Sequence, residues 1–145
     1  MFAREGNVVI AKFEDGEIIQ NLKELMGKLN AKAAIILNGV GQLEHAIIGY
    51  FDGNDYVKEE IEEAAELVSL QSLQGNIGMD GNDYIIHAHV ALGLKNHNIV
   101  GGHLIKGNVK VVNEIAIYLL ESTEIKRVRK GNLMEMLISS QQAKE

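Results

Sequence analysis

The chain has 145 residues, of which 46% are hydrophobic, and this is enough to build the core of one domain. It has no cysteine, which excludes disulfides, thiolate zinc sites and cysteine nucleophiles. The formal net charge of −6 disfavours binding to duplex nucleic acid, because that requires basic residues to neutralise phosphates.

The first third of the chain predicts a strand, a helix and two further strands. Before them, residues 1–7 carry a charge pair where a signal peptide needs an apolar stretch, and no apolar run could span a bilayer. We therefore expect a cytoplasmic protein without membrane partners. Residues 7–13 are rich in β-branched side chains and predict a strand. Apolar residues then recur at helical spacing from Glu17 to Leu29, with Asp15 as the expected helix cap. Strands are expected at residues 33–37 and 43–51, separated by a segment with two glycines.

The rest of the chain predicts turns and strands, with one segment that could be a helix or a strand. The sequence Asp-Gly-Asn-Asp-Tyr occurs at residues 52–56 and 80–84, and its composition predicts tight turns. Residues 58–67 are ambiguous: their glutamates and alanines favour a helix, whereas residues 66–73 could form a strand. Residues 84–118 predict three consecutive strands joined by short turns. The polar residues 139–145 predict a frayed tail, so that the single domain spans residues 1–138.

Three histidines are the candidate metal ligands. On a strand, His87 and His89 point to the same face, about 7 Å apart. A hairpin centred near Asn96 pairs Leu92 with Val100 and His89 with His103, which brings three imidazoles onto one face. Imidazole is a common ligand of zinc and related metals, so the pattern predicts a divalent transition metal, zinc above all. The alternative is a polar sheet face or subunit contact with hydrogen-bonded imidazoles; His45 and His97 are expected on the surface.

Glu114 is the candidate catalytic residue. The segment Lys106-Gly107-Asn108-Val109 is typical of a two-residue hairpin loop. Counting the register onward from that loop places Glu114 opposite Gly101, on the histidine face. Glu114 could then be a fourth metal ligand, a hydrogen-bond partner of a ligand, or a general base for a metal-bound water. The sequence leaves these three roles open, and no further cofactor is indicated.

Several segments together resemble the PPC domain (plants and prokaryotes conserved) in its stand-alone prokaryotic form. They are residues 67–77, 87–90, 101–104 and 113–115, supported by residues 43–52 and Arg4, and the resemblance covers about residues 2–137. It implies an α/β protein of the α+β type, with a mostly antiparallel β-sheet sandwich, few helices and a homotrimeric assembly. It also favours a strand over residues 66–73, and metal binding by His87, His89 and His103.

The same resemblance bears on DNA. Plant members of the family are nuclear proteins in which this domain follows an AT-hook, whose core is Arg-Gly-Arg-Pro. This chain contains no proline, so that DNA-binding element is absent. The basic residues 126–130 are interpreted as a solvated face or strand end, and direct DNA binding is disfavoured.

Three functions follow as hypotheses. The favoured one is a homotrimeric metal-binding protein, with a small molecule or another protein as possible partner and no assigned activity. The second is a metal-dependent hydrolase in which Glu114 assists a metal-bound water. The third is a DNA-associated regulator acting through residues 126–130. Whether the protein is an enzyme stays open at this stage.

Overall fold

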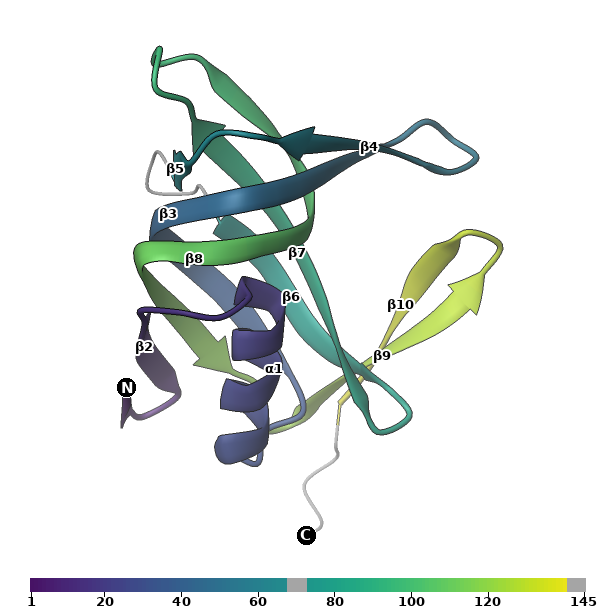
Figure 1. Cartoon of the computed structure of the whole chain (residues 1–145). Helices are drawn as coiled ribbons and strands as arrows, with labels where there is room; N and C mark the ends of the chain where they lie inside the picture. Colours follow the sequence, from purple (N-terminus) through teal and green to yellow (C-terminus); the bar gives the residue numbers. More distant parts are fainter. Residues whose placement is uncertain (68–72, 141–145) are drawn as a thin grey trace, which may run out of the picture.

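A computed structural model describes residues 1–67 and 73–140, which form ten β-strands and one α-helix (Figure 1). The strands join in one sheet, and among the described pairings only that of β6 with β9 is parallel. This confirms the predicted α+β fold with a mostly antiparallel sheet and few helices. The elements are β1 Phe2–Glu5, β2 Val8–Phe13, α1 Ile18–Lys28, β3 Ala34–Phe51, β4 Tyr56–Ile61, β5 Ala65–Leu67, β6 Leu73–Asp80, β7 Asp83–Gly93, β8 Ile99–Leu119, β9 Thr123–Lys130 and β10 Leu133–Ser140.

The sheet closes on itself around the core. Strand β8 pairs with both β3 and β7, and β6 also joins β3 to β7. Strands β1 and β2 extend the sheet beyond β8, whereas β9 and β10 extend it beyond β6. The β9–β10 hairpin, here called the arm, projects away from the closed body (Figure 1).

Helix α1 covers one side of this body and contacts β7 and β8. Its buried face is formed by Ile18, Leu22, Leu25 and Met26, in agreement with the predicted apolar spacing. The helix is capped by Glu17, whose carboxylate accepts hydrogen bonds from the backbone N–H groups of Ile19 and Gln20. The prediction that Asp15 caps the helix is therefore wrong, because the chain bends at residues 14–16 and the helix begins only at Ile18, directly after Glu17.

The two long strands β3 and β8 correct two sequence predictions. The strands expected at residues 33–37 and 43–51 are one strand, β3, with irregular pairing near its glycines. Likewise, residues 84–118 form two strands and not three, because β8 continues through the predicted hairpin loop. The glycines serve close packing: a Cβ on Gly41 would lie 2.0 Å from the carbonyl oxygen of Val112, and one on Gly107 would lie 2.9 Å from Leu43.

The ambiguous segment at residues 58–67 is extended. It forms β4 and β5, which pair with β3, so the helix favoured by propensity does not form there. Ile61, Ala65 and Leu67 are buried, and tertiary packing of these residues overrides the helix preference of the intervening glutamates. Residues 68–72 of the strand expected at 66–73 lie outside the described residues. Both Asp-Gly-Asn-Asp-Tyr segments contain turns, as predicted.

The arm changes the expected C-terminal boundary. Strand β10 ends at Ser140, and Ser139 and Ser140 pair with Glu124 and Thr123 of β9. The polar tail therefore does not begin at residue 139, because backbone pairing does not require an apolar side chain. Residues 141–145 lie outside the described part of the chain. No helix formed by the described residues is long and apolar enough to cross a membrane.

Candidate metal centre

Strands β7 and β8 bring the three predicted histidines together. The ladder pairs His89 with His103 and Leu92 with Val100, so the predicted register of this hairpin is confirmed. The ring centroids of His87, His89 and His103 lie 5.4–5.5 Å from one another. Each ring offers one nitrogen, and these nitrogens all lie within 4.8 Å of one another. The structure thus assembles the cluster that the sequence predicted.

The opposite face of β7 fixes the position of this cluster. Ile86, Ala88, Val90 and Leu92 alternate with the histidine face and are all buried in the core. On the neighbouring strand β8, Gly101 comes close to β7, since a Cβ there would lie 2.6 Å from the carbonyl oxygen of Val90. The histidines are therefore attached to well-packed backbone.

The environment keeps two of the rings neutral. Burial lowers the pKa of His103 to about 4, and the nearby His87 and His89 rings add to this effect. Burial also lowers the pKa of His87, followed by the positive charge of Arg127 and the His89 ring. At neutral pH each of these imidazoles consequently keeps one unprotonated nitrogen, which a metal ion requires.

The donor atoms fit a metal ion. Nδ1 of His103 is buried and has no hydrogen-bond partner among the described residues, which is unusual for a polar atom in a protein interior. Three nitrogens bound to one zinc ion lie roughly 3.3 Å apart, as follows from Zn–N bonds of about 2.0–2.1 Å. The observed limit of 4.8 Å exceeds this value, so the three rings would move closer together around an ion. A centre with three histidine ligands would leave a coordination position open.

A cavity of about 190 Å³ lies beside the cluster and is shared with the arm. Its lining includes His87, His103, Tyr56, Arg127 and Met134. The ring centroids of Tyr56 and His103 are 4.9 Å apart. Tyr56 belongs to β4, so side chains from separate parts of the sheet meet at this cavity.

Arg127 was missed by the sequence analysis. It is only 6% exposed, although it stands in the basic segment that was predicted to be a solvated face. Nη1 donates to the carbonyl oxygen of Met134 at 3.2 Å, and Nη2 donates to Oδ1 of Asn76 and lies 3.3 Å from Nδ1 of His87. The available signal was alternation: Ile125 and Arg127 are buried, whereas Lys126 and Val128 between and beyond them are exposed.

Glu114 is not brought to the histidines. Because β8 has no turn at Gly107, Glu114 pairs with Lys12 of β2 and Val40 of β3, and its side chain is exposed. The predicted register of Glu114 opposite Gly101 is wrong, since Gly101 pairs with Ala91 of β7. No carboxylate of the described residues belongs to the histidine cluster.

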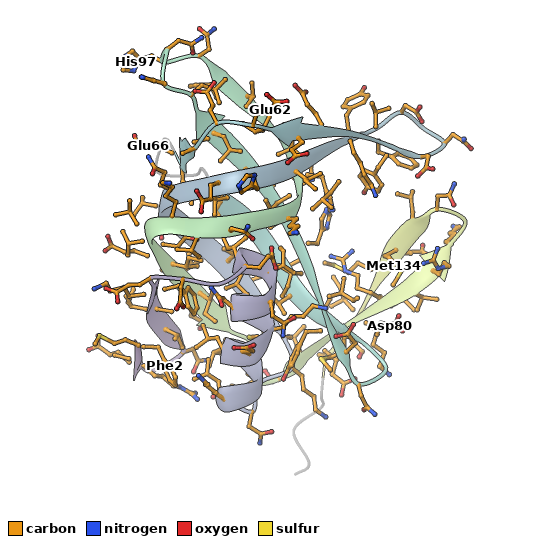
Figure 2. The ribbon with its side chains drawn as sticks, viewed as in Figure 1. Phe2, Glu62, Glu66, Asp80, His97 and Met134 are labelled. Carbon is orange, nitrogen blue, oxygen red and sulfur yellow. The ribbon has the colours of Figure 1, made fainter. Side chains whose placement is uncertain are left out.

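The remaining histidines lie on the surface, as expected. His45 is exposed and lies 3.9 Å from a carboxylate oxygen of Glu60. His97 is at the tip of the β7–β8 loop, away from Met134 and the arm (Figure 2). Neither residue belongs to the cluster.

The chain is similar to known proteins in sequence and in fold. The model of the Plants and Prokaryotes Conserved domain matches residues 2–123. A plant- and prokaryote-conserved protein of Pyrococcus horikoshii is 30% identical, with a TM-score of 0.79 over 94% of both chains. A protein of Archaeoglobus fulgidus described as metal-containing is 26% identical, with a TM-score of 0.77 over 94% of this chain and 98% of that one. A candidate DNA-binding protein of Bacteroides thetaiotaomicron is 19% identical, with a TM-score of 0.83 over 98% of both chains. The curated proteins gave no match.

Proposed function

The chain belongs to the Plants and Prokaryotes Conserved domain family, and from this premise we propose that it is a metal-binding protein with a three-histidine site. The observation that carries the proposal is the convergence of His87, His89 and His103, with nitrogens within 4.8 Å of one another. The lowered pKa values of His87 and His103 support it, because neutral rings bind metal without a proton to displace.

Zinc is the metal that we propose. All the clustered donors are imidazole nitrogens, which suit zinc and the neighbouring transition metals, whereas magnesium and calcium prefer oxygen. A bound zinc ion would act as a Lewis acid and would lower the pKa of a coordinated water. The metal-containing relative from Archaeoglobus fulgidus, at 26% identity, agrees with this proposal.

We also propose that the protein assembles as a homotrimer, as the family resemblance implies. The support within this chain is the arm, where four apolar side chains are 43–67% exposed: Val128, Leu133, Leu137 and Ile138. Exposed apolar side chains gathered on one projecting element are typical of an association surface. Light scattering coupled to gel filtration measures the mass in solution, and a monomer at micromolar concentration would contradict this assembly.

The other two functions receive less support. A hydrolase using Glu114 would lack its general base at the cavity, because Glu114 pairs with β2 and β3. DNA association through residues 126–130 would lack Arg127, which is buried, and the carboxylates of Glu124 and Glu135 lie 3.8 Å from Lys126 and Lys130, where they would repel phosphates. The candidate DNA-binding relative is 19% identical and therefore shows the fold alone.

Metal analysis tests the proposal directly. Untagged wild-type protein is compared with His87→Ala and His103→Ala, and with His97→Ala as a control for loss of a surface imidazole. We expect about one ion per chain in the wild type and the control, and less than about a tenth of this in the two cluster variants. Wild-type protein that holds no metal after dialysis against zinc would contradict the proposed function.

A further inference from the structure

Arg127 is a buried cation for which the described residues supply no anion. The residue is only 6% exposed, and none of the ion pairs formed by the described residues joins it to a carboxylate. Nε is buried and has no hydrogen-bond partner there. Burial lowers the pKa of Arg127, but a guanidinium keeps its charge at neutral pH. Buried charges in proteins are normally paired, so we expect an anion to bind beside Arg127.

A bound metal ion would add further positive charge beside Arg127. The imidazoles are neutral ligands, and the histidine cluster contains no described carboxylate that would offset the charge of a divalent ion. Nη2 of Arg127 lies only 3.3 Å from Nδ1 of His87, so the guanidinium and a bound ion would be close neighbours. An anion placed between them would be attracted by both charges.

Hydrogen bonding at His87 makes the two charges interdependent. Nη2 of Arg127 can donate to Nδ1 of His87 only when that nitrogen carries a lone pair. A metal ion either takes the lone pair of Nδ1 or binds Nε2, whose proton must then reside on Nδ1. In both cases Arg127 loses this acceptor. Metal binding therefore frees one N–H group of Arg127 for a ligand at the same cavity.

The cavity limits the ligand to a small molecule. Its volume of about 190 Å³ exceeds the roughly 10–15 Å³ that holds one water molecule, but it is smaller than the roughly 300–1,000 Å³ of pockets for drug-sized ligands. Apolar side chains make up much of its wall, namely Ile85, Leu133 and Met134, together with the ring of Tyr56. These walls favour an anion with a short hydrocarbon body over inorganic phosphate, which is hydrated on all sides.

We propose that Arg127 and the three-histidine centre together bind a small organic carboxylate. The carboxylate lies between the metal ion and the guanidinium, and its short apolar body contacts the wall formed by β7 and the arm. This inference rests on the proposed metal site. The inference adds Arg127 of the arm to the site, and Arg127 lies beyond residues 2–123, which the family model matches.

Binding of unbranched monocarboxylates tests this inference. Calorimetric titration of acetate through hexanoate, and of inorganic phosphate, is carried out on zinc-loaded and on chelator-treated wild-type protein. The variants are Arg127→Gln and Arg127→Lys, and Arg129→Gln serves as the matched control because Arg129 is an exposed arginine on the same strand. Zinc content and melting temperature are measured for each sample, so that a folding defect is recognised.

We expect zinc-loaded wild type and Arg129→Gln to bind the carboxylates equally, with affinity rising by up to about fourfold per added methylene. Arg127→Gln should weaken binding by about tenfold or more at unchanged zinc content, because a charge-assisted hydrogen bond is lost. Arg127→Lys should lie between them, and chelator-treated wild type should bind at least about tenfold more weakly than the zinc form.

Three results would overturn the inference. Equal carboxylate affinity of zinc-loaded wild type and Arg127→Gln would remove Arg127 from the site while leaving the metal proposal intact. Preference for phosphate, or no gain with chain length, would exclude the carboxylate class, and this readout needs no variant. Wild-type protein without zinc would overturn the metal proposal and this inference together.

Discussion

Strand β7 has two faces with opposite character. On one face, Ile86, Ala88, Val90 and Leu92 are at most 8% exposed and pack into the common core. On the other, His87 and His89 line up with His103 beside a cavity, and nearby polar atoms such as Nδ1 of His103 have no partner among the described residues. The first face stabilises the fold, and the second holds polar atoms that could bind a ligand in fixed positions. The predictions below test this division, from the largest expected effect to the smallest.

Substitution on the core face should act on stability. Leu92 is fully buried, so Leu92→Ala should lower the free energy of unfolding by about 2–5 kcal/mol, through lost burial and the cavity that remains. Urea denaturation measures the change. Ile99→Ala on the adjacent strand is the control, because Ile99 is 65% exposed and should change stability by less than about 0.5 kcal/mol. Equal effects of the two variants would contradict the division between the faces.

Substitution on the histidine face should act on metal binding. His89 is exposed, so His89→Ala should leave the unfolding free energy of metal-free protein within about 0.5 kcal/mol of wild type. It should nevertheless weaken zinc binding by more than about 100-fold, since even groups that only support a ligand contribute 10–100-fold. Competition with a chromophoric chelator measures the affinity. Undiminished zinc affinity would show that His89 is not a ligand.

The pH dependence of metal-free protein should report the burial of His103. The unfolded chain protonates this ring near the ordinary value of 6.5, whereas the folded protein does so only at about 4. The unfolded state therefore holds more protons between these values, and the free energy of unfolding should fall as the pH is lowered from about 6.5 to about 4. The facing rings of His87 and His89 add to the effect of burial on the pKa of His103, whereas the charge of Arg127 acts on the pKa of His87.

Histidine ring signals in the NMR spectrum measure this titration. Chelator-treated wild type is compared with His103→Gln, in which the loss of stability between the two pH values should be smaller. A His103 ring that titrates near 6.5 would mean that its environment is more open than the structure shows.

The smallest expected effect is that of Glu114→Gln. Because Glu114 is exposed and pairs with β2 and β3, its amide variant should keep full zinc content and change stability by less than about 0.5 kcal/mol. Metal analysis and urea denaturation provide the measurements. A loss of zinc in this variant would restore Glu114 as a candidate ligand and contradict the continuous strand β8.

Local patterns in the sequence determined much of the fold. The spacing of apolar residues predicted helix α1, because one face of a helix repeats about every 3.6 residues. The two-residue period of a strand put His87 and His89 on one face, and the short β7–β8 loop allowed the pairing of His89 with His103 to be counted correctly. Each of these inferences uses neighbours in the sequence or a single turn.

Only the tertiary structure decided the features that depend on distant contacts. Gly107 resembles a turn residue in the sequence, but its role is close packing against Leu43, so that β8 continues and Glu114 is carried to β2 and β3. Arg127 stands in a basic segment whose composition predicts a solvated surface. The pairing of β9 with β6 nevertheless turns the Arg127 side chain toward Asn76 and His87. A residue's own neighbours fix the direction of its side chain, but the environment in that direction is supplied by strands far away in the sequence.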